Sequence, residues 1–259
     1  MDTRKLGQAL KKVNITAFRF LEQVGSTNDL ALDWLASGAP EYALVIADAQ
    51  TAGRGRQGRS WVTTPGASIA LSLILYPSQA EQENLGLFPL ASGLAVARAI
   101  EEFGVDEVQV KWPNDVLIKR MKTAGVLVES VWEGDRLHGM VIGIGINVQK
   151  KSVPPADGLL YPATCIEDHT TANVDVITLI IATISNLMHL RTGLCNSNFN
   201  ENYMSKLAFL KEKVVIRDQD PQSSIGTLEG IDPAGQLLLR LEDGRLQTFA
   251  AGDVSLRPI

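Results

Sequence analysis

Three arginines alternate with three glycines in the segment 51–61, whose sequence TAGRGRQGRSW ends at a tryptophan. Glycine adopts backbone conformations that other residues avoid, and arginine adds a permanent charge and a planar set of donors that fits carboxylate and phosphate. The segment is therefore expected to close over an anionic ligand. Ordering such a loop costs on the order of 10 kcal/mol, so we expect it to be mobile when empty. A solvated surface loop is the alternative interpretation.

Two further segments place polar side chains beside expected secondary structure. Ser26 or Thr27 precedes apolar residues spaced for one helical face over 30–35, and either residue would cap that helix. The alternative is that hydroxyls and free amides at this helix start bind a polar or anionic ligand. The run KWPND (111–115) ends an apolar strand with a turn, in which Asp115 is a turn acceptor, a metal-linked carboxylate or a base.

Other motifs argue against two common nucleotide sites. Segment 143–148 (GIGINV) partly resembles a dinucleotide-binding fingerprint, but its third glycine is missing and it lies within a strand pattern. A strand whose glycines let another group approach closely is the better interpretation. The Gly/Arg loop lacks the GxxxxGKS/T order of a P-loop. Lys122 follows a basic turn, where a lysine is usually solvated.

The composition limits the classes of function. The chain has 259 residues, of which 45% are hydrophobic, and a net charge of -5, which argues against general nucleic-acid binding. Cys165 and Cys195 form no CxxC and there are only three histidines, so neither a disulfide framework nor a zinc site is indicated. The polar N-terminus and the absence of long apolar runs predict no signal peptide and no membrane span. A cytoplasmic protein is expected.

The pattern of apolar residues and turn signals predicts an α/β domain followed by a small β-domain. Helices are expected over 30–38, 85–103, 175–190 and 198–210. Strands are expected over 15–21, 43–47, 68–76, 108–112, 116–118, 123–131 and 137–148. Four shorter strands, over 214–217, 225–230, 236–241 and 246–250, predict a small β-barrel.

Five separated blocks occur together in a specific order. They are GSTN (25–28), QTAGRGRQGRSW (50–61), KWPND (111–115), KTAGVLVE (122–129) and GIGIN (143–147). In this order they resemble the biotin–protein ligase family, and DVSLR (253–257) is similar to that family's C-terminal end. The resemblance implies an α+β fold: a mixed β-sheet with helices on one face, like class II aminoacyl-tRNA synthetases, then an SH3-like β-barrel. It implies a catalytic domain over 1–210 and a small domain over 211–259.

The family couples biotin to a lysine of a biotin carboxyl carrier protein, using ATP and Mg²⁺. Biotin carboxylate attacks the α-phosphate to give biotinyl-5′-AMP, and the carrier lysine then displaces AMP. The resemblance assigns Lys122, Arg56 and Asp115 to catalysis, with Arg56 retaining the adenylate and Asp115 orienting or deprotonating the incoming lysine. It assigns biotin binding to Ser26, Thr27, Asn28, Gln50, Arg54, Gly55, Arg56, Lys122 and Gly125. It assigns nucleotide binding to Arg54, Arg59, Trp61, Asn114, Asn147 and Arg257, and leaves the metal ligands unknown.

Departures from the family pattern set limits on these expectations. Many members carry an N-terminal winged helix-turn-helix, for which this chain shows no pattern, so no repressor role is expected. Residues 67–70 lack an asparagine common there. The family often forms dimers through sheet edges, and the sequence does not decide between monomer and dimer. The rival functions are a lipoate–protein ligase, a non-catalytic sensor of biotin or its adenylate, and a nucleic-acid binder.

Overall fold

The computed structural model describes residues 1–15, 17–155, 161–194, 196–217, 223–250 and 255–258. Cys195, most of the turn expected over 218–224, Gly252 and the first two residues of the DVSLR block lie outside the described residues. No helix in the described ranges is long and apolar enough to cross a membrane.

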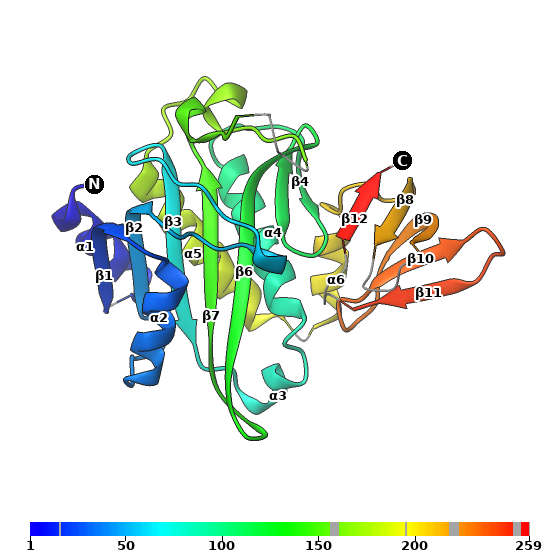
Figure 1. Cartoon of the computed structure of the whole chain (residues 1–259), viewed down its shortest axis with the longest axis horizontal. Coiled ribbons are helices and arrows are strands. Elements are labelled where there is room, and N and C mark those ends of the chain that lie inside the picture. Colours follow the sequence, from blue (N-terminus) through cyan, green and yellow to red (C-terminus); the bar gives the residue numbers. More distant parts are fainter. Residues whose placement is uncertain (16, 156–160, 195, 218–222, 251–254, 259) are drawn as a thin grey trace.

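A seven-stranded mixed sheet forms the centre of the molecule (Figure 1). Its strand order is β1-β2-β3-β7-β6-β5-β4, with β1 parallel to β2 and all other neighbours antiparallel. Strands β1 and β4 are therefore its edges. The strands are β1 (Phe18–Val24), β2 (Leu44–Gln50), β3 (Ser68–Leu75), β4 (Val108–Lys111), β5 (Asp115–Ile118), β6 (Met121–Glu133) and β7 (Arg136–Asn147).

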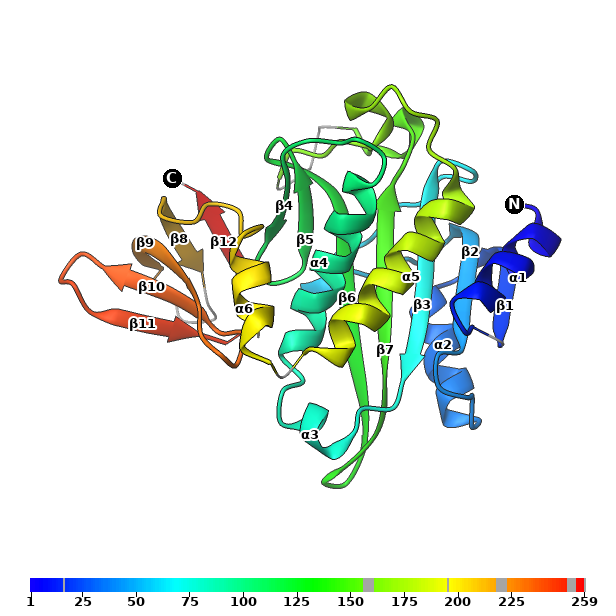
Figure 2. The same ribbon diagram turned by 180° about the vertical axis from the view of Figure 1, so that it is seen from behind.

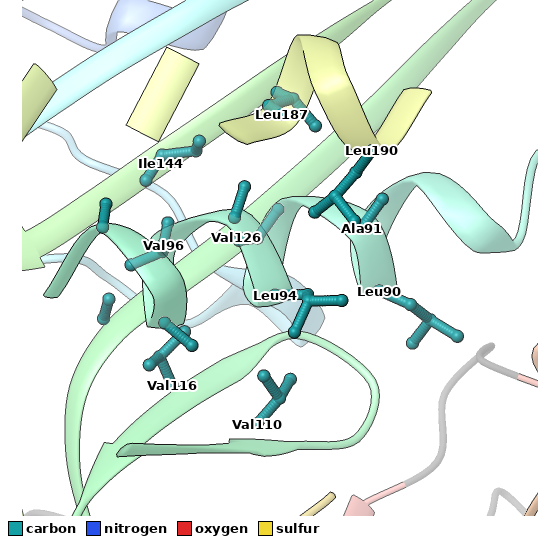
Figure 3. Packing of buried hydrophobic residues seen from close by; sticks show 14 of the residues in the cluster. Leu90, Ala91, Leu94, Val96, Val110, Val116, Val126, Ile144, Leu187 and Leu190 are labelled. Atoms are coloured by element: carbon teal, nitrogen blue, oxygen red, sulfur yellow. The ribbon is translucent and has the colours of Figure 1, made fainter. Parts of the chain in front are cut away.

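Two long helices cover one face of the sheet (Figure 2). They are α4 (Leu87–Glu101) and α5 (Val176–Thr192), and α1 (Thr3–Lys12) packs into the same core through Leu6 and Leu10. Figure 3 shows Leu90, Leu94 and Val96 of α4 among valines of the sheet and leucines of α5. The short helices are α3 (Gln79–Gln82) and α6 (Ser197–Met204), and the 3-10 turns are η1 (Arg56–Gly58), η2 (Lys150–Ser152) and η3 (Glu167–His169).

Helix α2 (Thr27–Ala36) packs on the opposite face of the sheet, so the expectation that all helices share one face was wrong (Figure 1). Strand β2 is apolar on both sides: Leu44 and Ile46 lie in the large core, whereas Val45 lies in a second core with Ala31 and Leu35 of α2. Successive strand residues point to opposite faces. The apolar half of β2, residues 44–47, therefore requires cover on both faces of the sheet.

The C-terminal part forms a five-stranded antiparallel sheet in the order β11-β10-β9-β8-β12. Trp112, which follows β4, contacts this part of the chain, because its Nε1 donates to the carbonyl of Gly235 at 3.0 Å. Gly235 has φ +79, and a Cβ there would lie 2.7 Å from Leu87 Cδ2. The strands are β8 (Lys213–Arg217), β9 (Ser224–Ile231), β10 (Leu237–Leu241), β11 (Leu246–Phe249) and β12 (Ser255–Pro258).

Candidate active site

Two adjoining pockets, with volumes of about 130 and 430 Å³, share part of their lining. The residues that line both are Arg59, Ser60, Trp61, Asp115, Lys122 and Arg257. Every site residue predicted from the sequence lines the smaller pocket except Asn147, which lines the larger one. The structure therefore brings the five blocks and the C-terminal strand β12 together at one place.

The floor of the smaller pocket lies along a cross-strand row of residues that includes Gly145 and Gly125. Strand register places Ala70 opposite Gly145, Gly145 opposite Gly125, and Gly125 opposite Asp115. Cross-strand partners point to the same face, so this row leaves a hollow that ends in a carboxylate. Lys111 lies opposite Asp115 and completes the row.

The glycines of the GIGIN block make room for two side chains in this hollow. A Cβ at Gly143 would lie 2.1 Å from Asn28 Oδ1, and one at Gly145 would lie 2.3 Å from Trp61 Cε2. The interpretation of a glycine-bearing strand that allows close approach is therefore confirmed. Trp61, assigned above to nucleotide binding, lies against this floor between the pockets, and its Nε1 has no hydrogen-bond partner among the described residues.

One end of the smaller pocket is a closed network of polar groups. Thr27 donates to Gln50 Oε1 from both its backbone nitrogen (2.7 Å) and its hydroxyl (3.0 Å). Ser72 Oγ lies 2.8 Å from Thr27 Oγ1 and 2.6 Å from Asn28 Oδ1. Sequence reasoning missed Ser72, although a serine within the apolar strand over 69–75 is a signal for a buried polar contact.

Glu129 of β6 joins the start of α2 to the Gly/Arg loop. Its carboxylate accepts hydrogen bonds from Asn28 Nδ2 at 2.7 Å and from both terminal nitrogens of Arg54 at 2.8 Å. Arg54 also donates to Asp29 at 2.6 Å. The hydrogen bonds that Arg54 donates to Glu129 raise the pKa of Arg54 above its usual value. Sequence reasoning assigned no role to Glu129 or Asp29, because each lies far along the chain from Arg54.

The other two arginines of the loop have different partners. Arg56 Nη1 donates to Asn114 Oδ1 at 3.4 Å, and Arg59 donates to the side chain of Gln57. Asn114 also donates to the carbonyl of Val126 at 2.7 Å. The loop thus lies across β6 and β7 (Figure 1) with contacts from several elements, and its predicted mobility when empty stays a prediction.

Asp115 lies between two lysines where the pockets meet. Lys122 Nζ is 2.5 Å from Asp115 Oδ1, and Lys111 Nζ is 3.2 Å from Asp115 Oδ2. Burial alone would raise the pKa of Asp115, but the charges of Lys122 and Lys111 outweigh burial and hold that pKa well below its usual range. Asp115 is therefore ionised at neutral pH, which suits it to hold an ammonium group.

The larger pocket is lined by groups from three further segments. Arg257 of β12 and Lys111 both lie over the ring of Tyr161, at 5.6 and 4.7 Å from its centroid. Asn147 Nδ2 donates to the carbonyl of Thr164 at 3.2 Å, while Asn147 Oδ1 is buried with no partner among the described residues. Burial lowers the pKa of Arg257 from its usual value. Tyr161 gave no signal in the sequence beyond its place in a proline-rich loop.

The comparisons with known proteins agree with this geometry. Residues 20–147 match the biotin/lipoate A/B protein ligase family, and residues 212–257 match the biotin protein ligase C-terminal domain. The biotin–[acetyl-CoA-carboxylase] ligase of Paracoccus denitrificans is 32% identical over 241 residues, which cover 90% of this chain and 98% of that protein. The chain belongs to the biotin–protein ligase family.

Two other relatives extend the match over nearly the whole chain. The bifunctional ligase/repressor BirA of Bacillus spizizenii is 34% identical over 248 residues, or 92% of this chain and 73% of that protein. The Aquifex aeolicus biotin protein ligase, solved in complex with biotin and ATP, has a TM-score of 0.79 and 28% identity over 95% of this chain and 100% of its own. Membership of the biotin–protein ligase family and the predicted α+β fold class are thus confirmed.

Proposed function

We propose that this chain is an ATP-dependent biotin–protein ligase that forms biotinyl-5′-AMP and transfers biotin to a lysine of a biotin carboxyl carrier protein. The observation that carries the proposal is the pair of adjoining pockets that meet at Lys122 and Asp115. Such a site holds two anionic substrates end to end, with cations where they join. Attack of one anion on another requires this neutralisation.

In the first step a biotin carboxylate oxygen attacks the α-phosphorus of ATP, and pyrophosphate leaves with the electron pair of the broken P–O bond. We assign the smaller pocket to biotin, because its closed polar network fits a polar ring, and the larger pocket to the nucleotide. Lys122 lines both and neutralises charge on the carboxylate and the α-phosphate. Asn147, Arg59 and Arg257, which line the larger pocket, are proposed to hold the nucleotide, and Trp61 to lie against it. Asn114 lines the smaller pocket and is proposed to contact the nucleotide from there.

In the second step the neutral amine of the carrier lysine attacks the biotinyl carbonyl carbon, and AMP leaves. Asp115 is proposed to orient the incoming lysine, whose ammonium proton passes to solvent because the low pKa of Asp115 makes that carboxylate a weak base. Arg56, which lines the smaller pocket, is proposed to retain the mixed anhydride until the carrier arrives. Keeping water from an activated acyl group favours a loop that covers it.

Mg²⁺ enters this proposal as part of the ATP substrate. No group of three or more His, Cys, Asp or Glu side chains in the described ranges is placed to hold a metal ion. Mg²⁺ commonly keeps several waters and binds through phosphate oxygens.

The proposal also includes a catalytic domain over 1–210 and a small domain over 211–259. It places the protein in the cytoplasm, without binding to nucleic acid, as a monomer or a homodimer.

The test incubates purified protein with ATP, Mg²⁺ and biotin and detects biotinyl-5′-AMP by mass spectrometry, with lipoate replacing biotin in a parallel reaction. We expect biotinyl-AMP alone, followed by transfer when a carrier protein is added. Formation of lipoyl-AMP alone would assign the chain to the lipoate branch. Binding of biotin without turnover of ATP would support the sensor instead.

A further inference from the structure

Lys111 is a buried cation that the proposed chemistry does not use. Its side chain is 5% exposed, against 26% for Lys122, and both ammonium groups contact the same carboxylate through different oxygens. Strand register fixes this arrangement, since Lys111 is the cross-strand partner of Asp115 at the end of the β4–β5 turn. Lys111 therefore stays beside Asp115 and lines only the smaller pocket, whereas Lys122 lines both pockets.

The pair of lysines matters because Lys122 has two competing anionic partners. In the structure Lys122 contacts Asp115, but the proposed reaction requires its charge at the biotin carboxylate and the α-phosphate. A buried carboxylate that loses its only cation is strongly disfavoured. With Lys111 on its second oxygen, Asp115 remains paired when Lys122 turns toward the ligands.

We propose that Lys111 is a positioning residue that neutralises Asp115 and thereby frees Lys122 to act on the two substrate anions. This inference rests on the proposed function. It separates the two lysines by role: Lys122 touches the reacting groups, whereas Lys111 acts only through Asp115. Lys111 must be protonated to do so.

The surroundings of Lys111 give this requirement a pH signature. Burial lowers the pKa of Lys111 to about 8; Asp115 opposes that shift, while Arg257 and Lys122 add to it. The ammonium also lies over the ring of Tyr161, 4.7 Å from its centroid. Below this pKa Lys111 carries its charge and above it the charge is lost, so adenylation should fall as the pH rises past about 8.

The experiment measures pyrophosphate release in the first step, at saturating biotin and ATP, for the wild type, Lys111→Met and Lys111→Arg. We expect Lys111→Met to lower kcat on the order of 100-fold. We expect Lys111→Arg to retain most of the activity and to lack the fall above about pH 8, because arginine stays protonated there. Lys206→Met is the matched control, since Lys206 pairs with Glu101 outside both pockets.

A double variant separates neutralisation of Asp115 from packing. If Lys111 only balances the charge of Asp115, then Lys111→Met combined with Asp115→Asn recovers the first step by about tenfold or more over Lys111→Met alone. Adenylation by Lys111→Met within about threefold of the wild type would overturn the inference, as would an unchanged alkaline fall in Lys111→Arg. If Lys111→Met does not fold, the double variant and the pH profile of Lys111→Arg still decide. Wild-type protein that forms no biotinyl-AMP would instead overturn the proposed function.

Discussion

The two ends of the candidate site differ in how their polar groups are satisfied. One end of the smaller pocket, here called the closed end, is a network of polar side chains that hydrogen-bond mainly to one another. Its members are Thr27, Asn28, Gln50, Ser72 and Glu129. At the junction of the pockets, Lys122 and Lys111 both contact the carboxylate of Asp115, and Arg257 lines both pockets. Trp61 Nε1 at the junction and Asn147 Oδ1 in the larger pocket have no partner within the described part of the chain.

This difference indicates a division of labour between binding and chemistry. A network that is complete without ligand holds its geometry, which favours selection of one ring shape. Uncompensated positive charge is stabilised only when anions arrive, and most strongly when charge develops between them in the transition state. Changes at the junction should therefore alter kcat, and changes at the closed end should alter biotin affinity.

The largest effect is expected for Lys122→Ala at the junction. Loss of this ammonium should lower the rate of biotinyl-AMP formation on the order of 1000-fold. Asp115 keeps Lys111 as a partner, so the variant should unfold at nearly the wild-type temperature. Pyrophosphate release and thermal unfolding measure the two quantities, and near-normal turnover would contradict the assignment of Lys122.

Arg56→Gly tests retention of the intermediate. Loss of a charged hydrogen-bonding group should speed release of biotinyl-AMP roughly 10- to 100-fold, so that lysines of unrelated proteins become labelled. Streptavidin blots of a mixture of carrier and bovine serum albumin measure this selectivity. Labelling confined to the carrier would show that Arg56 does not retain the adenylate.

Glu129→Gln tests the link between α2 and the loop. The amide keeps the shape but removes the charge that holds Arg54, so the KM for biotin should rise about tenfold with kcat nearly unchanged. Asp29→Asn is the matched variant, because Asp29 binds the same guanidinium with a side chain that is 55% exposed, and its effect should stay within about threefold. If Asp29→Asn raised the KM for biotin more than Glu129→Gln does, Arg54 would be held mainly by its contact with α2 and not by its contact with β6.

The sequence predicted most elements of the fold, and it failed where tertiary contacts decided the outcome. Helix α1 was missed because only Leu6 and Leu10 mark its buried face. The helix expected over 198–210 ends at Met204, because the residues that follow form backbone hydrogen bonds with β4. The carbonyl of Lys206 accepts from the backbone nitrogen of Val110, and the backbone nitrogen of Ala208 donates to the carbonyl of Val110.

The site shows the same limit. Ordered blocks located the predicted residues, because each block carries a local signature. Lys111 stood within a quoted block without a role, and Glu129 ended another. Lys111 matters because it contacts Asp115, and Glu129 matters because it contacts Arg54. Both contacts join residues on different strands or loops, and a linear sequence pattern does not encode the strand register that brings them together.

The smallest predicted effect decides between the two interpretations of the start of α2. Ser26 and Asp175 both cap helices, but Ser26 Oγ accepts from the backbone nitrogen of Asp29 at 3.4 Å, whereas Asp175 accepts from that of Thr178 at 2.8 Å. Ser26→Ala should therefore cost only about 0.5 kcal/mol of unfolding free energy, and Asp175→Ala about 1 kcal/mol.

The affinity for biotin should distinguish the two variants in the opposite order, with the larger effect from Ser26→Ala. Ser26 is buried and lines the smaller pocket, so its loss should weaken biotin binding roughly fivefold, whereas Asp175→Ala should leave biotin binding unchanged. Urea unfolding and calorimetric titration with biotin measure the two quantities in the same preparations. If Ser26→Ala changed stability alone, capping would fully account for Ser26, and the closed end would begin at Thr27.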